Sequence, residues 1–126
     1  MAGDFTKKIG TDRLDFDFYR TERTDGFNTA MTNNIAGTPY STTDKIHQII
    51  SSSGLTYHFG DKNGNDTNTF IRVSNKHSSE NGSFAGSTDI HSLDDWTVDG
   101  QKQWNLDKHT VVAGFSWDRQ SFEHTN

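Results

Sequence analysis

The chain has 126 residues, a net charge of −5 and no cysteine, and only 29% of its residues are hydrophobic, so a conventional buried core would be thin. The length suits one domain and is too short for two comfortable ones. The 12 basic residues are scattered among 17 acidic ones, which argues against a nucleic-acid partner, and the lack of cysteine excludes disulfides and thiolate chemistry.

Membrane-spanning helices are excluded as well, because nowhere do 18 apolar residues follow one another. The first residues, MAGDFTKKIG, have no apolar run behind their charges, so we expect no signal peptide in this stretch. A spanning strand remains compatible with the sequence, since it needs only about 9–11 residues, half of which are allowed to be polar.

Short alternating runs of β-branched and aromatic residues, separated by Gly, Asn, Asp and Ser, predict an all-β chain. The first run, DRLDFDFYRTER, predicts a strand over 12–23 with Leu14, Phe16 and Phe18 on one face. The polar segment after it has no period and predicts a long loop over 24–43.

The second run is KIHQIISSSGLTYHFG, and one of its faces ends in the aromatic residues Tyr57 and Phe59. The Asn-Gly segment at 60–66 predicts a tight turn between antiparallel strands. The strand after this turn, TNTFIRVSNKH, has Ile71 and Val73 on one face. These segments together predict a β-hairpin.

A second long polar loop is predicted at 78–92. The run WTVDGQKQWNL comes next, with one apolar face that only Lys102 interrupts. A short turn at 105–108 then leads to a last strand over 109–124. On a lipid-facing surface Lys102 would cost about 2–4 kcal/mol at mid-membrane, so we expect there either a shifted apolar band or a bulge that changes the face.

Long and short connections alternate in this interpretation, so the long loops leave one end of the sheet and the tight turns leave the other. Outer-membrane barrels have short periplasmic turns and longer extracellular loops. The non-apolar faces are rich in Ser, Thr, Gln and Asn, which suits a wet interior, and aromatic residues close the apolar runs where rings would meet lipid headgroups. We therefore predict an antiparallel meander of about five strands that forms a segment of an outer-membrane β-barrel.

Two segments, IISSSGLTYHFGDKNGNDTNTFIRVSNKH and QWNLDKHTVVAGFSWDRQSFEH, resemble the barrel of TonB-dependent outer-membrane receptors of Gram-negative bacteria. In that family a tight periplasmic turn is followed by an upstroke of the form HT-apolar-x-x-G-aromatic. The resemblance covers most of residues 11–124. It implies a plugged barrel of about 22 strands that imports a scarce nutrient such as a ferric siderophore, haem or cobalamin with energy passed on by TonB.

Five strands do not close such a barrel, and neither a plug domain nor a TonB-contacting segment is recognisable. We therefore expect residues 1–126 to be a partial barrel domain, from a truncated product or a fragment, located in the bacterial outer membrane. The expected partners are outer-membrane lipid, the remainder of the barrel and plug, TonB in the intact receptor, and a small-molecule nutrient. No enzymatic activity, cofactor or metal is expected.

Two other interpretations stay open. The first is a soluble, secreted β-sandwich that acts as a binding module, for example for carbohydrate, because exposed Trp residues also form sugar platforms. The second is a small complete outer-membrane barrel that assembles from more than one chain. The apolar faces distinguish a sandwich from a barrel wall, since a sandwich buries them against a second sheet about 10 Å away.

The segment DKNGND suggests calcium, because Asp61, Asn63 and Asn65 are spaced like alternate ligands of an EF-hand loop. However, Asp66 stands where that loop needs Gly, and Arg72 stands where it needs Glu. We therefore expect a turn at this position.

Among the six histidines, His77 and His91 flank the second predicted loop and are the candidates for a metal or haem site. We expect both to be solvated residues at strand ends, because no H-x-x-x-H or H-E-x-x-H spacing occurs. No nucleophile, base and orienting group combine in a known catalytic pattern. Two carboxylate pairs that would suggest glycoside hydrolysis are interpreted as solvated acids, the first on one strand face and the second in a loop: Asp15 with Asp17, and Asp94 with Asp95.

Overall fold

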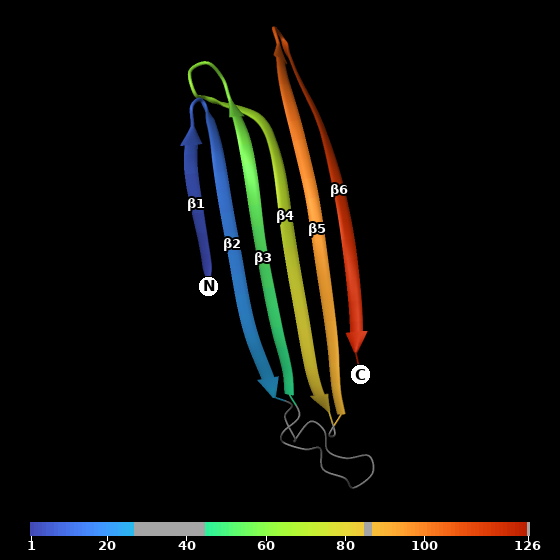
Figure 1. Cartoon of the computed structure of the whole chain (residues 1–126). Coiled ribbons are helices and arrows are strands. Elements are labelled where there is room, and N and C mark those ends of the chain that lie inside the picture. The colour runs from blue at the N-terminus through green and yellow to red at the C-terminus, as the bar shows by residue number, and fades with distance from the viewer. Residues whose placement is uncertain (27–44, 85–86, 126) are drawn as a thin grey trace.

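The computed structural model describes residues 1–26, 45–84 and 87–125. Within these residues every strand pairs antiparallel with its neighbours in the chain, and the spatial order is β1-β2-β3-β4-β5-β6. The sheet is open, because β1 and β6 lie at opposite edges (Figure 1). The strands are β1 (Ala2–Ile9), β2 (Asp12–Gly26), β3 (Lys45–Gly60), β4 (Asp66–Phe84), β5 (Ser87–Leu106) and β6 (His109–Thr125).

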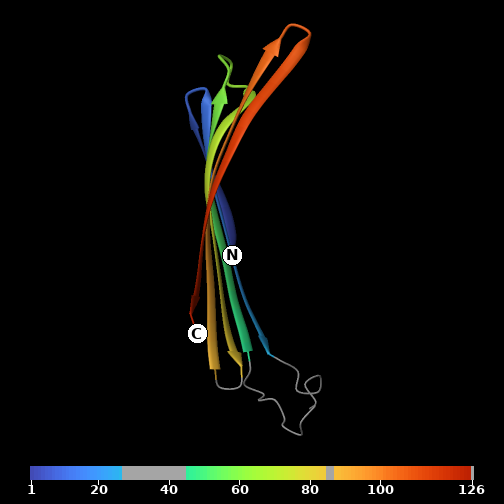
Figure 2. The same cartoon turned by 90° about the vertical axis from the view of Figure 1, so that its right-hand side faces the viewer.

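The described residues make a single layer. Figure 2, which shows the sheet from its side, shows a long ribbon of strands that twists along its length. None of the hydrophobic residues in the described part is buried. The predicted all-β antiparallel meander is therefore confirmed, and the two-layer packing of a sandwich is not formed by these residues.

The structure has six strands where about five were predicted, because β1 was missed. Phe5 is flanked by Gly3 and Lys7 on its face, so the alternation that marks an amphipathic strand is weak there. The strand forms by pairing with β2, where Phe5 lies opposite Phe16. The turn between the two strands contains Gly10 with a φ of 61°, a conformation that glycine adopts without steric cost.

The predicted loop at 78–92 is wrong. β4 continues to Phe84 and β5 begins at Ser87, and the register between them is unbroken from Phe70 opposite Gln101 onward. Both strands continue because backbone hydrogen bonds to neighbouring strands satisfy the peptide groups whatever the side chains are. The predicted alternation of long and short connections therefore fails between β4 and β5. Residues 24–26 of the loop predicted at 24–43 belong to β2, and the rest of that loop lies outside the described residues.

The register places most of the large apolar side chains on the same side of the sheet, although Tyr19, Ile50, Phe70, Val112 and Phe122 lie on the other side. Residues that face each other across antiparallel strands point to one side, and one such row runs across five strands as Phe16, Leu55, Val73, Val98 and Trp117. We call this side the apolar face and the other side the polar face. The apolar face carries Phe5, Leu14, Phe16, Phe18, Leu55, Tyr57, Phe59, Ile71, Val73, Trp96, Val98, Trp104, Val111, Ala113, Phe115 and Trp117.

Candidate membrane-facing surface

The apolar face is uncovered. Phe5, Phe115 and Trp117 keep 62%, 58% and 53% of their surface exposed, and even Leu55 and Ile71 in the middle strands keep 45% and 46%. Contiguous apolar surface of this extent marks a place where a protein meets another protein or a membrane. This face is therefore the first candidate for a functional surface.

Aromatic side chains stand at both ends of the apolar stretch on β5. Trp96 and Trp104 are eight positions apart on the apolar face, which corresponds to about 26 Å along an extended strand. A strand tilt of about 40° reduces this length to a height of about 20 Å, close to the apolar band of about 25 Å in outer-membrane barrels. The two Trp residues thus stand where the aromatic girdles of such a band would lie.

Small residues on the apolar face are covered by neighbouring rings. A Cβ atom at Gly100 would overlap the ring of Phe115, which lies directly opposite on β6, and one at Gly3 would overlap Phe18, its partner on β2. An aromatic ring that lies over a cross-strand glycine shields the bare backbone and fixes the register. These pairs give the surface a defined shape without a second layer.

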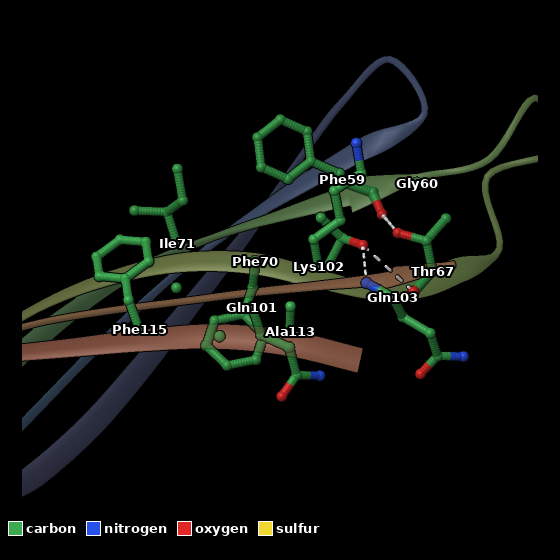
Figure 3. A pocket seen from close by; sticks show the side chains of 13 residues that line it. Phe59, Gly60, Thr67, Phe70, Ile71, Gln101, Lys102, Gln103, Ala113 and Phe115 are labelled. Atoms are coloured by element: carbon green, nitrogen blue, oxygen red, sulfur yellow. Dashed lines mark hydrogen bonds between the residues drawn. The ribbon is translucent and has the colours of Figure 1, made fainter. Parts of the chain in front are cut away.

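A groove of about 720 Å³ lies near the tight turns, where the pairing of β4 with β5 ends, and residues from both sides of the sheet line it. Figure 3 shows Phe59 and Ile71 projecting from one side of the sheet, while Gln101 projects from the other side. Gly100 and Ala113 also line the groove and leave room between the larger side chains. The groove is mostly apolar and open, and no catalytic set of side chains lines it among the described residues.

Lys102 stays on the apolar face, opposite Ala113. Of the two expected alternatives, a bulge is not found between the described residues of β5 and β6, whose register runs unbroken through Lys102. The pairing of β5 with β4 ends one residue earlier, at Gln101 opposite Phe70. The ammonium group lies 5.1 Å from the centre of the Trp104 ring, a cation–π distance. Lys102 is therefore near the turn end of the apolar band, beside the aromatic residue that closes it.

Charged side chains on the polar face form a bonded network. The guanidinium of Arg72 donates to Asp17 at 2.8 and 3.0 Å and to the hydroxyl of Thr56 at 2.8 Å. Thr56 is only 6% exposed. Among the described residues a polar residue is thus enclosed where no large apolar one is, which is the reverse of a water-soluble sheet.

Asp15 is the centre of a second cluster on the polar face. Its Oδ2 accepts from Arg13 Nε at 3.0 Å and lies 3.0 Å from Nε2 of His58. The side chains of His58 and Asp15 are only 22% and 28% exposed. Asp15 and Asp17 share one strand face, as the sequence predicted, and each is held by its own cation.

The second carboxylate pair lies in β5 and not in a loop as predicted. Asp94 is on the side of the apolar face, where it contacts His77 at 2.8 Å, and Asp95 is on the opposite side, where Gln120 donates to it at 3.4 Å. Successive residues of a strand point to opposite faces. The pair therefore does not form one site.

The DKNGND segment is a self-capped turn. Oδ1 of Asp61 accepts from the backbone N–H groups of Asn63 and Asn65 at 2.8 and 2.9 Å. These bonds, with that of Asn65 first, lower the pKa of the Asp61 carboxyl. The carboxylate is thus occupied by turn amides, in agreement with the interpretation of this segment as a turn.

His77 and His91 do not form a joint site, because they point to opposite sides of the sheet. His77 contacts Asp94, whereas His91 lies opposite His124 on the polar face, and both of these histidines contact Asp89. The sequence interpretation missed this second arrangement. Counting outward from the turn at Asp107 and Lys108 would have brought His91 and His124 opposite each other, had the strand been known to extend that far.

Comparison with protein-family models, with curated proteins and with solved structures gave no match to this chain. Within the described residues, no helix is long and apolar enough to cross a membrane.

Proposed function

We propose that this chain is part of the barrel wall of an outer-membrane transporter of the TonB-dependent receptor type, which imports a scarce nutrient such as a ferric siderophore, haem or cobalamin. The observation that carries the proposal is the inverted sheet. Large apolar side chains such as Leu55 and Ile71 are open on one side, and charged groups such as Asp15 and Arg72 are linked by hydrogen bonds on the other. A barrel wall needs this polarity, with lipid outside and water inside.

The position of the apolar residues on successive strands supports a tilted, barrel-like arrangement. The apolar residues of β2 are centred on Phe16, whose row reaches β6 at Trp117. The apolar run of β6, from Val111 to Trp117, is centred three residues closer to the turn, at Gly114. In a barrel whose strands are about 4.8 Å apart and tilted by about 40°, the apolar band shifts along the chain by about one residue from each strand to the next. From β2 to β6 this gives a shift of about four residues, close to the three that are found.

The polar face supports the role of an inner wall. Ion pairs on it connect strands across the sheet, as in the bridge from Arg72 to Asp17, and Ser116 donates to Asp99 at 2.6 Å near the opposite edge. Such bonds are stronger where neighbouring structure partly excludes water. In the proposed barrel these groups face the lumen and the plug.

The two edge strands support the proposal that further strands complete the sheet. β6 is exposed along its whole length, and β1 pairs only on one side. Unpaired edges of this length template pairing with other strands. We propose the remainder of the barrel as the partner of both edges.

Two neighbouring single-cysteine variants test which face meets lipid, because the chain has no cysteine of its own. Val73→Cys lies on the apolar face and Ser74→Cys on the polar face. In lipid vesicles, a membrane-impermeant maleimide is expected to label Ser74→Cys at least about tenfold faster than Val73→Cys. In a soluble binding module the order is reversed or lost, and a chain that is a monodisperse monomer without detergent contradicts the proposal.

The coding sequence on either side of this segment gives a second, independent test. A plug domain encoded upstream and further amphipathic hairpins downstream are expected for a receptor barrel. If the flanking sequence instead encodes a soluble domain, with no further amphipathic strands of about 9–11 residues that could span a membrane, the barrel assignment is contradicted whatever the labelling result.

A further inference from the structure

Three side chains of types that can bind metal ions converge on the polar face at the end of the sheet opposite the tight turns. Asp89 and His91 are two residues apart on β5 and point to the same side, and His124 lies directly opposite His91 on β6. Nε2 of His124 is 2.6 Å from Oδ1 of Asp89, and Nε2 of His91 is 3.1 Å from Oδ2. The two imidazole rings are stacked, with centroids 4.4 Å apart and an angle of 14° between the planes.

Hydrogen bonds to Asp89 orient the imidazole rings of His91 and His124, with Nε2 of each ring directed at the carboxylate. An ionised carboxylate only accepts hydrogen bonds, so both imidazoles contact Asp89 through a protonated Nε2. The bond from His124 is the main cause that lowers the pKa of the Asp89 carboxyl, and the charge of His91 adds to it. One ligand atom from each of the three residues therefore points to a common place, and these atoms all lie within 4.8 Å of one another.

We propose that Asp89, His91 and His124 bind one divalent transition-metal ion, with Zn²⁺ as the probe ion. Two imidazoles and one carboxylate are a ligand set that zinc accepts, and a fourth position stays open for water or another ligand. Tetrahedral bonds of about 2.0–2.1 Å place ligand atoms about 3.4 Å apart, so rotations of exposed side chains suffice. Each Nε2 gives up its proton when the metal binds: a neutral ring becomes the Nδ1–H tautomer, and a protonated ring releases one proton to solvent.

The surroundings favour a cation. Glu80 on β4 lies opposite His91 and adds a second carboxylate on the same face. Among the described residues, this is the one group of three His, Asp or Glu side chains whose ligand atoms come this close together. His77 with Asp94, by contrast, forms a pair on the other side of the sheet.

This inference goes beyond the proposed transport function and does not depend on it, since it needs only the β5–β6 register. If the sheet is a receptor wall, the site faces the lumen away from the tight turns. If the sheet belongs to another kind of protein, the same three residues bind the ion.

The test is a zinc titration of the full 126-residue chain in detergent micelles, in competition with a chromophoric chelator. Far-UV circular dichroism reports strand content in the same samples. We expect one Zn²⁺ per chain and a loss of affinity of about tenfold or more in His124→Gln. His77→Gln removes a histidine that also contacts an aspartate, and it is expected to leave the affinity unchanged.

Nuclear magnetic resonance of the ring carbons identifies the ligands directly. Zn²⁺ is expected to shift the signals of His91 and His124 and not that of His77. If the chain has little strand signal before metal is added, Zn²⁺ should raise it in the wild type and not in His124→Gln. The proposal is overturned if the folded wild type binds no Zn²⁺, or if His124→Gln and His77→Gln weaken Zn²⁺ affinity equally. It is also overturned if Zn²⁺ raises the strand content of His124→Gln as much as that of the wild type.

Discussion

Arg72 on β4 reaches across β3 to Asp17 on β2, with Nη1 2.8 Å from Oδ2 and Nη2 3.0 Å from Oδ1. The side chain passes over Gly54 on β3, where a Cβ atom would overlap the guanidinium. This ion pair ties together two strands that are not neighbours. The single layer is therefore braced across its width by a charge pair as well as by backbone pairing.

Replacing Gly54 with valine is expected to push Arg72 away from Asp17. Both partners are about a third or more exposed, so the expected loss in the free energy of unfolding is only about 1 kcal/mol. Asp17→Asn should cost a similar amount, and the double variant should cost less than the sum because both changes remove one interaction. Denaturant unfolding in detergent, followed by circular dichroism, measures the three values. Fully additive losses would show that the two residues act independently.

A second substitution tests the cover of Gly100 by Phe115. An alanine methyl group at Gly100 would overlap the ring, so Gly100→Ala is expected to lower the free energy of unfolding by about 1–3 kcal/mol. The loss should shrink by at least about 0.5 kcal/mol when Phe115→Ala is already present. Gly82→Ala is the control, since its nearest atom, the carbonyl oxygen of Asp89, would be 3.9 Å away. An equal effect at Gly82 would contradict this explanation.

The depth of Lys102 predicts how a charge is tolerated along the apolar face. Lys102→Leu is expected to change the free energy of folding in lipid vesicles by about 1 kcal/mol or less, because charges near the interface cost little. Val73→Lys puts the charge mid-band and should cost about 2–4 kcal/mol. Ser74→Lys, on the polar face, is the matched control with a small expected effect. Equal costs for Val73→Lys and Ser74→Lys would mean that neither face meets lipid.

The turn at Asp61 is expected to loosen in acid. Its pKa is lowered in the folded state, chiefly by the backbone N–H of Asn65, so this carboxylate stabilises the turn above its unfolded pKa. The contribution is lost as the pH falls through the folded value, which places the change below about pH 4. Amide hydrogen exchange of Asn63 and Asn65 measures it. Asp61→Asn should show no such pH step, and a wild type without the step would contradict the assigned cause.

The sequence predicted those strands whose apolar side chains alternate. The strand predicted from KIHQIISSSGLTYHFG has the bounds found for β3, Lys45–Gly60, because Tyr57 and Phe59 mark one face clearly. The extension of β4 past His77 was not predicted, since both of its faces are polar and periodicity gives no signal. Its strand conformation depends on pairing with neighbours far away in the chain.

The candidate metal site was missed for the same reason. His91 and His124 are 33 positions apart, and only the register of a hairpin places them side by side. The apolar face was predicted because the alternation of apolar residues is visible within each single strand. A site assembled from two strands requires the bounds of both, and polar residues leave those bounds undefined in sequence.

All three tryptophans of the chain, Trp96, Trp104 and Trp117, lie on the apolar face. They lie at different positions along the strand direction, with Trp96 and Trp104 at the two ends of the apolar stretch of β5 and Trp117 opposite Val98 between them. The unlabelled protein therefore carries its own optical reporter of that surface: emission shifts to the blue when hydrocarbon covers it, while events in the opposite, charged surface leave the spectrum largely unchanged.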